Sequence, residues 1–319
     1  MSANFYRSAY SFDQAVWDLG TSQGLAGLAI DPKIHRNRDY YLESDIRRLW
    51  AQWFIEGVLD PYALIEKFDE PALMDVMKEV EHSLASTFNI PTNISWPPIR
   101  ASISEALLRR VEQIIALQKR KAFTSKDREL LLAQAGPDPR CWICGDAFSK
   151  EAVSIFKGES AKINLPFYID ILRPKGLKER HLKIEIDHIF PIAKGGEHDI
   201  ANFRLCCGWC NIHKKDRTSL YEVNGAPVRL KHGVITKSTS IRTIPRSFWS
   251  VRAMGLLQRC EHEGCTATAS NAPLLISLIE PSGAATPSNL RVVCDKHDEY
   301  SASRLHLLQD VESALPKRG

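Results

Sequence analysis

The sequence predicts an α+β protein in which a helical N-terminal region precedes two small zinc-braced parts. Apolar residues recur every three or four positions through much of the first 135 residues, a period typical of amphipathic helices. Near the middle, Cys141-x-x-Cys144 is matched by Cys207-x-x-Cys210, with an alternating strand pattern between the pairs. Three further cysteines and a histidine follow residue 259, and both sets have spacings typical of structural zinc sites.

The composition is that of a folded protein with two or three domains, which we place at residues 1–135, 136–222 and 223–319. Of the 319 residues, 44% are hydrophobic and 25% are charged, which excludes a disordered or fibrous chain. We find no signal-peptide pattern and no apolar run near the roughly 18 residues that span a bilayer, so we expect a cytoplasmic protein without a membrane partner. Its eight cysteines are then expected to be reduced thiolates holding zinc rather than a secreted disulfide framework.

Charge is divided unevenly along the chain. Residues 1–100 hold 14 acidic and 9 basic side chains, so the formal net charge of +4 leaves +9 for residues 101–319. Because Lys and Arg that neutralise phosphates supply most sequence-independent affinity for nucleic acid, the second part is expected to carry the phosphate-binding surface. The acidic first part is expected to face something else.

The first region is expected to be helical from Leu42 to about Ala85. Its apolar stripe is expected to lie in the core rather than in a ligand groove, because helices bury one face against a partner. The stripe comprises Ile46, Leu49, Trp50, Trp53, Phe54 and Val58. A further helix can start at Pro71, and the three prolines in residues 89–98 predict a connector there.

The clearest helix is predicted over residues 102–123. Its apolar side holds Leu107, Leu108, Val111, Ile114 and Ile115, and its basic side holds Arg109, Arg110, Lys119, Arg120 and Lys121. The basic side suits contact with nucleic acid, but charged helix faces more often meet only water, and we favour that interpretation. A second helix from Ser125 is expected to end near Gly136, at the first domain boundary.

The central segment is predicted to form a strand, a loop, a second strand and a helix. In residues 183–188, Ile184 and Ile186 alternate with acidic residues, as in a half-buried strand. Proline and glycines then break the strand, residues 202–206 can return as a second strand, and residues 208–217 fit a short helix.

This segment resembles the HNH endonuclease family over about residues 141–218. Four elements occur in the family's order, which is far more specific than a lone Asp-His pair. They are Asp187-His188-Ile189-x-Pro191, Gly195-Gly196, Asn202, and Cys207-x-x-Cys210-Asn211-x-x-Lys214. The resemblance implies a ββα-metal fold and hydrolysis of DNA to 5′-phosphate ends. Residues 156–178 lengthen the segment relative to compact relatives, and the sequence does not place their strands.

The resemblance also implies a role for each catalytic position. His188 is the general base that takes a proton from the attacking water, and an ordinary imidazole pKa of about 6.5 suits this task. Asp187 and Asn211 hold one divalent cation, Mg²⁺ or Mn²⁺. Asn202 completes the catalytic set and is one of the groups that can orient the His188 ring.

Three choices stay open within this segment. Asn211 stands where the family's letters have histidine, and His213 is a rival ligand; the two are about 200° apart around a helix, and we prefer Asn211. Cys206 and Cys207 point to opposite faces of a strand, and the Cys-x-x-Cys spacing selects Cys207 for zinc. His198 either approaches the substrate or packs locally, and we favour local packing.

The last domain holds a basic stretch and the second zinc-ligand set. Residues 227–259 contain seven Lys or Arg and no Asp or Glu, and Phe248-Trp249 is expected to add aromatic surface for DNA contact. The residues that we expect to contact nucleic acid are Lys214, Lys215, Arg217, Arg242 and Arg246. The ligand set, Cys260, Cys265, Cys294 and His297, suits a closed structural site, with His262 exposed beside it.

Together these features favour a divalent-metal-dependent HNH endonuclease with two structural Zn²⁺ ions and a catalytic Mg²⁺ or Mn²⁺. DNA is the expected partner, and restriction or another anti-phage defence is the expected role. An alternative is a non-catalytic zinc-braced protein that binds nucleic acid or a partner, although the intact motif argues against it. A third is a nuclease activated by a protein partner, or a homodimer, through the N-terminal helical region.

Overall fold

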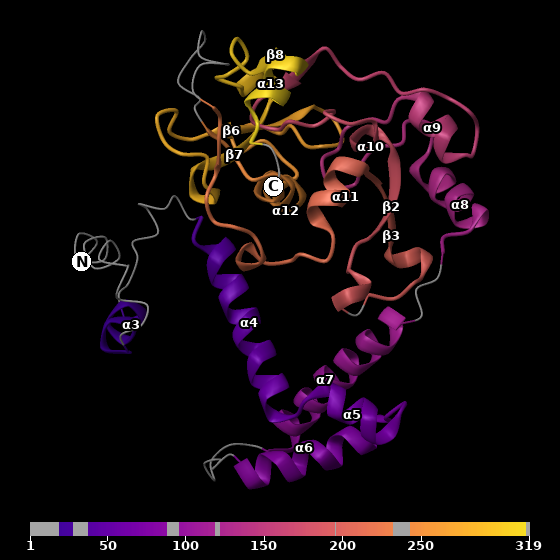
Figure 1. The fold of residues 1–319 in the computed structure, drawn as a ribbon, viewed down its shortest axis with the longest axis vertical. Coiled ribbons are helices and arrows are strands. Elements are labelled where there is room, and N and C mark those ends of the chain that lie inside the picture. Colours follow the sequence, from indigo (N-terminus) through magenta and orange to yellow (C-terminus); the bar gives the residue numbers. More distant parts are fainter. Residues whose placement is uncertain are drawn as a thin grey trace.

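A computed structural model of the chain describes residues 19–27, 38–87, 96–118, 122–194, 196–231 and 243–316. A helical arm projects from a body of helices and short strands (Figure 1). The four sheets among the described residues are each two antiparallel strands. The predicted mixture of helices with small sheets is therefore confirmed. None of the described helices is long and apolar enough to cross a bilayer.

The arm has its own apolar core. It contains α4 Tyr40–Val58, α5 Pro61–Phe68, α6 Leu73–Thr87 and α7 Trp96–Gln118, and α3 Leu19–Ala26 precedes it. In Figure 1, α4 descends from the body, α5 and α6 lie at the far end, and α7 returns. The buried residues are Val58, Leu64, Val76, Val80, Leu84, Ile103, Leu107 and Val111. The predicted apolar side of α7 thus lies in this core.

Helix α7 begins earlier than the predicted start at residue 102. Trp96 is its first residue, and Pro97 and Pro98 lie in its first turn. Backbone amides in the first turn have no partner within the helix, so prolines there do not interrupt it. Residues 89–95 of the expected connector lie outside the described residues.

The expected burial of the α4 stripe is wrong. Trp50 is 70% exposed, Trp53 is 64% exposed, and Ile46 and Phe54 are exposed as well. Only Val58, at the end of the helix, joins the arm core. The helical period predicts a stripe along one face, but it does not say which face of the helix meets the rest of the molecule.

The central motif lies on a hairpin-like pair of strands followed by a helix. β2 Ile184–His188 pairs with β3 Phe203–Cys207, and the chain then enters α11 Gly208–Lys214. Ile184 and Ile186 point into a core covered by α8 Ser125–Ala135 and α9 Lys150–Phe156, as their alternation predicted. Short helices fill the connections, namely α10 Glu179–Leu182, η1 Ile192–Lys194 and η2 Ile200–Asn202.

The C-terminal part shares a core with this unit. Its elements are η3 Leu220–Glu222, β4 Val228–Arg229, β5 Thr243–Ile244, α12 Ser247–Leu257, β6 Leu274–Leu278, η4 Pro287–Asn289, β7 Leu290–Cys294, η5 Asp295–His297, β8 Leu305–Leu307 and α13 Leu308–Ala314. β1 Tyr168–Asp170, from the long segment before the motif, pairs with β8. One buried cluster includes Tyr41 of α4 and residues from Cys141 to Val311, so residues on both sides of the boundary predicted after residue 222 pack together.

Phe248 and Trp249 belong to this core, which corrects their expected exposure. Each is only 4% exposed. Both lie on α12, which packs against β6, β7 and α11. They therefore hold the body together and offer no stacking surface for DNA bases.

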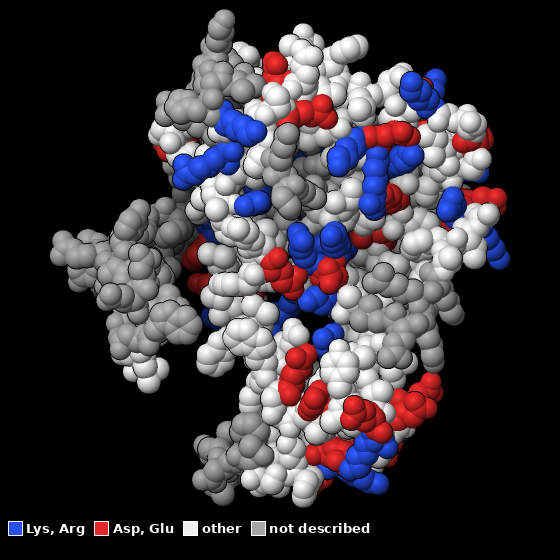
Figure 2. Space-filling view, viewed as in Figure 1, with Lys and Arg blue, Asp and Glu red and all other residues white. Residues whose placement is uncertain are grey.

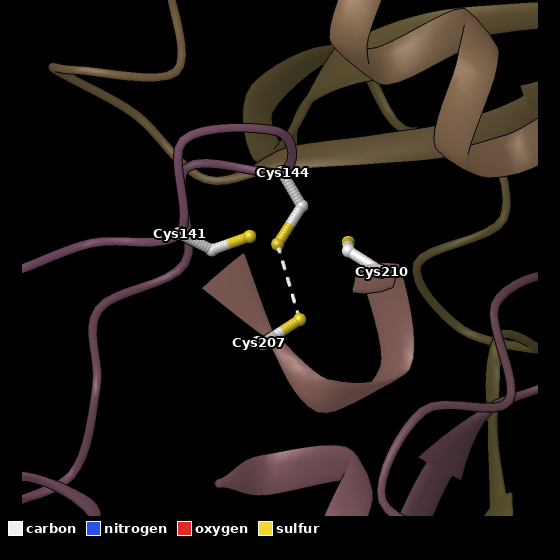
Figure 3. Close-up of side chains that lie close together, drawn as sticks. All are labelled: Cys141, Cys144, Cys207 and Cys210. Carbon is white, nitrogen blue, oxygen red and sulfur yellow. Dashed lines mark hydrogen bonds between the residues drawn. The ribbon is translucent and has the colours of Figure 1, made fainter. Parts of the chain in front are cut away.

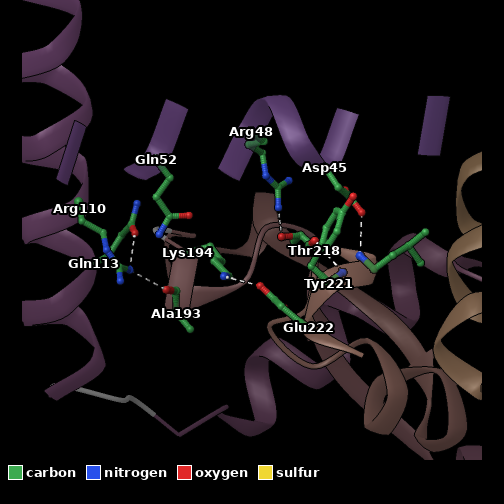
Figure 4. A network of polar contacts seen from close by, with 12 residues as sticks. Asp45, Arg48, Gln52, Arg110, Gln113, Ala193, Lys194, Thr218, Tyr221 and Glu222 are labelled. Carbon is green, nitrogen blue, oxygen red and sulfur yellow. Dashed lines mark hydrogen bonds and ion pairs between the residues drawn. The ribbon is translucent and has the colours of Figure 1, made fainter. Parts of the chain in front are cut away.

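Polar contacts fasten the arm to the body (Figure 4). The Asp45 carboxylate of α4 is 2% exposed, accepts a 2.7 Å hydrogen bond from the Leu220 amide, and pairs with both terminal nitrogens of Arg252 at 2.7 and 2.9 Å. Further along, Arg110 of α7 donates to the carbonyl oxygen of Ala193 in η1 at 3.3 Å. The arm is thus attached to the body through both α4 and α7.

Candidate functional site

The first cysteine cluster joins the two ends of the central motif (Figure 3). The four sulfur atoms of Cys141, Cys144, Cys207 and Cys210 lie within 4.8 Å of one another, and all four residues are buried. The Cys144 and Cys207 sulfurs are 4.0 Å apart. This is too far for a disulfide and close to the edge of about 3.8 Å in a tetrahedron with zinc–sulfur bonds of about 2.3 Å. The donor set fits a structural zinc ion.

Basic side chains surround this cluster. Lys175 Nζ lies 3.9 Å from Cys144 Sγ and donates to the Asp146 carboxylate at 2.7 Å, and Arg173 pairs with the same carboxylate. Burial opposes the charge on Asp146, but Arg173 and Lys175 hold the pKa of this carboxyl well below its usual range. Nearby cations also favour the thiolate form that zinc binds.

Cys206 lies beside the cluster without joining the set of four. It is fully buried, and its sulfur is 3.9 Å from that of Cys141. On β3 it pairs with Glu185, whereas Cys207 pairs with Ile184, so the two cysteines leave opposite faces of the strand. All eight cysteines are free of disulfide bonds in the structure.

A second cluster lies at the end of β7. The ligand atoms of Cys260, Cys265, Cys294 and His297 lie within 4.8 Å of one another. His297 Nδ1 is 3.3 Å from Cys294 Sγ and 3.6 Å from Cys260 Sγ. His262 is exposed, as expected, and stacks on the His297 ring with 3.8 Å between centroids. This Cys₃His set also fits a structural zinc ion.

Asp187, near the end of β2, carries a buried carboxylate that lies beside the Lys214 ammonium group. It is 5% exposed and accepts hydrogen bonds from Trp142 Nε1 at 3.1 Å and from Lys214 Nζ at 3.0 Å. Lys214 also donates to the carbonyl oxygen of His188 at 2.6 Å. Burial raises the pKa of the Asp187 carboxyl, and Lys214 opposes that rise. The position therefore favours a nearby positive charge.

His188 lies among aromatic rings on the other side of β2. Its ring meets Phe203 edge-on with 5.0 Å between centroids, and Phe123 lies 5.5 Å away. Its Nε2 atom is 3.4 Å from Nδ1 of His198. His198 thus packs against the predicted general base, and it also lines the cleft described below.

Asn202 fastens the loop between β2 and β3 rather than the His188 ring. Its side-chain oxygen accepts from the Phe190 amide at 2.9 Å, and its nitrogen donates to the carbonyls of Phe190 and Glu197 at 3.0 and 2.8 Å. A Cβ atom on Gly196 would lie 1.7 Å from the Phe190 carbonyl oxygen, so only glycine fits there. The predicted Asn and Gly positions thus act together to fold the loop.

Asn211 offers an oxygen donor from α11. Its amide nitrogen donates to Glu185 Oε2 at 2.7 Å, so the planar amide directs its oxygen away from Glu185. The rival ligand His213 packs edge-on against Trp209, with 5.2 Å between ring centroids. Asn211 and Asp187 both line the same cleft. Two oxygen donors of this kind fit Mg²⁺, which usually keeps several of its waters.

The segment that carries this site matches one known protein family. Residues 175–221 match the HNH endonuclease family. The matched segment includes β2, β3, α11 and the second cysteine pair, and a segment of this family implies nuclease activity in general. No curated protein and no solved structure matches the chain.

The HNH segment forms one wall of a cleft of about 1330 Å³, and the arm forms the other. The HNH wall includes His188 and His198, and the arm contributes Glu70 and Glu112. In Figure 2 the surface is hollowed between the arm and the body, and acidic side chains are frequent on the arm. One acid of the first hundred residues, Glu70, and Glu112 of α7 thus line the same cleft as the HNH motif, a placement that no pattern in the sequence indicated.

The basic residues predicted to contact nucleic acid are placed differently from one another. Lys215 lines the cleft beside the HNH motif, whereas Lys214 forms an ion pair with Asp187. Arg217 is half-buried just after α11. Arg246 donates to the Ala226 carbonyl at 2.6 Å, and Arg242 lies outside the described residues. Lys215 is the member of this set that lines the cleft.

Proposed function

We propose that the chain is a divalent-metal-dependent endonuclease that hydrolyses phosphodiester bonds of DNA. One observation carries the proposal: His188, Asp187 and Asn211 line a single cleft, on strands and a helix that a cysteine cluster braces. An imidazole beside two oxygen donors is the set that metal-assisted hydrolysis of a phosphodiester needs.

In the proposed reaction, His188 accepts a proton from the water that attacks phosphorus. A bond forms between the water oxygen and phosphorus, and the bond to the 3′ oxygen breaks. The products are a 5′-phosphate end and a 3′ hydroxyl, whose proton comes from solvent water. A neutral imidazole is suited to this step because its ordinary pKa lies near the operating pH. Lys215, in the same cleft, is placed to contact the phosphate backbone.

Asp187 and Asn211 are the residues that would hold Mg²⁺ or Mn²⁺. Such an ion supplies positive charge opposite the charge that grows on the phosphate and the leaving oxygen. Lys214, which contacts both Asp187 and the His188 carbonyl, would keep this carboxylate ionised and tie α11 to the end of β2. The two sulfur-rich clusters are assigned to structural Zn²⁺ ions.

DNA is the proposed substrate because residues 101–319, which include the HNH segment, carry the positive charge of the chain. We assign the enzyme a role in restriction or another defence against foreign DNA in the cytoplasm. The absence of disulfides among its eight cysteines suits a reducing compartment.

The test is cleavage of supercoiled plasmid by the purified full-length protein. We expect nicked or linear product with Mg²⁺ or Mn²⁺ and none with EDTA, and we expect His188→Ala to lower the rate by about 100-fold or more. His306→Ala is the matched control, since this half-buried histidine lies on β8 and contacts the Ser303 carbonyl. Equal cleavage by wild type and His188→Ala would rule the proposal out.

A second candidate is a nuclease that stays silent until a partner moves the arm. The observation in its favour is the pair of carboxylates, Glu70 and Glu112, that the arm places in the cleft, where they repel an entering phosphate. In that case the protein alone leaves plasmid intact, and a variant that loosens the arm, such as Asp45→Ala, begins to cut.

A further inference from the structure

We propose that His198 is a positioning residue for the general base, and that it selects the tautomer of His188 that can accept a proton. The inference rests on the proposed nuclease function. It starts from the 3.4 Å approach of His188 Nε2 to His198 Nδ1, two ring nitrogens contributed by separate parts of the site. His188 ends β2, and His198 lies in the loop that leads to η2.

The loop that carries His198 is built to hold it there. Asn202 links the backbone carbonyls of Phe190 and Glu197 through one amide nitrogen, at 3.0 and 2.8 Å. Gly196 passes so close to the Phe190 carbonyl that a side chain cannot be accommodated. Asn202 thus holds both the start of the loop, at Phe190, and the residue next to His198, Glu197. These bonds limit the positions that the His198 ring can take.

Two phenylalanines complete the confinement of the imidazole pair. Phe123 stacks on His198 with 5.2 Å between centroids, and Phe203 meets both histidine rings edge-on, at 4.9 Å from His198 and 5.0 Å from His188. Phe203 is almost fully buried. Rings enclosed in this way have few alternative rotamers, which favours the contact between their nitrogen atoms.

The contact has a chemical consequence for the base. A neutral imidazole has one N–H donor and one acceptor nitrogen, and the hydrogen bond at one nitrogen determines which tautomer is present. When His188 Nε2–H donates to His198 Nδ1, the acceptor of His188 is Nδ1, and that atom takes the proton from water. When His198 Nδ1–H donates instead, His188 Nδ1 carries a hydrogen and cannot act as a base. The reaction therefore requires the first arrangement, in which His198 is the acceptor.

A purely structural role for His198 and a positioning role predict different orders of activity for its replacements. If the ring only fills space between Phe123 and Phe203, an aromatic residue should serve well and a small polar one poorly. If the nitrogen orients His188, a polar acceptor near the Nδ1 position should serve, and an aromatic ring without nitrogen should not. His198→Phe and His198→Asn thus distinguish the two roles by the order of their rates.

The experiment measures kcat and KM for plasmid or duplex cleavage by wild type, His198→Asn, His198→Phe and His188→Ala. We expect His198→Phe to lose about 10- to 100-fold in kcat with little change in KM, the usual effect of removing a group that orients a catalytic one. We expect His198→Asn to retain clearly more activity than His198→Phe, although the phenylalanine variant should unfold at the same or a higher temperature.

The outcomes separate this inference from the proposed function. If His188→Ala cuts like wild type, the nuclease assignment fails. If His188→Ala is inactive while His198→Phe matches wild type or exceeds His198→Asn, the positioning role is overturned. If either variant fails to fold, nitrogen NMR of the wild-type protein decides instead, and the His188 signals are assigned by their loss in His188→Ala. A proton on Nε2 of His188 supports the inference. A proton on Nδ1 of His188 overturns it.

Discussion

At the scale of single residues, Cys206 and Cys207 differ in function although they are adjacent and both are buried. The sulfur of Cys207 belongs to the set of four that lies within 4.8 Å, whereas Cys206 only borders it. A buried cysteine outside a metal set behaves as a small apolar residue, so its replacement by alanine removes little.

We therefore expect Cys206→Ala to keep two zinc ions per chain and Cys207→Ser to keep one. Metal analysis of the purified proteins by mass spectrometry measures this directly, and wild type is the reference for two ions. If Cys206→Ala retains only one zinc ion, then Cys206, and not Cys207, completes the cluster.

The sequence located the residues of the candidate site but not their contacts. Ligand spacing and strand alternation depend on local geometry, so Cys207 and the two faces of β2 could be predicted. Lys214 on Asp187 and Glu185 on Asn211 join residues about 26 positions apart in sequence, and their pairing depends on how α11 packs against β2. The approach of His198 to His188 likewise requires the folded loop.

At the scale of elements, α4 is an amphipathic helix whose apolar stripe faces solvent. Its face toward the body carries polar groups, among them Asp45 and Arg48, whereas Trp50 and Trp53 point to solvent. The helical period predicts the apolar stripe, but the stripe faces solvent rather than the core. A buried ion pair, Asp45 with Arg252, fastens the helix together with Tyr41, whose ring joins the core of the body.

Asp45→Ala should release α4 from the body and lower the free energy of unfolding by about 3 kcal/mol or more, because it leaves the Arg252 guanidinium buried without its partner. Thermal unfolding and hydrogen exchange of the α4 amides measure both effects. Glu43→Ala is the matched control, since Glu43 is an exposed acid on the same helix, and it should change stability by less than about 0.5 kcal/mol. Equal exchange in both variants would contradict a fastening role for Asp45.

At the scale of the whole molecule, the outward stripe of α4 is an exposed apolar surface. Its members are Leu42, Ile46, Trp50, Trp53 and Phe54. A buried aromatic side chain removes about 150–250 Å² from water, so the exposed parts of the three aromatic rings alone offer roughly 350 Å². Monomeric proteins rarely expose more than a few hundred Å² in one apolar patch.

A second copy of the chain is the occupant that we propose for this stripe. Two antiparallel α4 helices related by a twofold axis would each bury the same residues, as an isologous interface requires. The adjoining groove between α4 and α7, about 360 Å³ and lined by Phe54 and Ile99, extends the contact toward the 800 Å² or so per partner of a stable dimer. Such a dimer would also supply two cleavage sites of opposite polarity, one for each strand of a duplex.

We expect the wild-type protein to be a dimer at micromolar concentration and Trp50→Glu to be a monomer, because a charge at the centre of the paired stripe cannot be desolvated without a partner. Light scattering after gel filtration measures the mass, and circular dichroism verifies that the variant is folded. Tyr62→Glu is the matched control, since Tyr62 is 58% exposed on α5 and lies outside the stripe, so this variant should stay dimeric. On plasmid, monomeric Trp50→Glu should produce nicked circles and little linear DNA, because one site cuts one strand at a time. A wild-type protein that is monomeric at every concentration tested would refute the pairing.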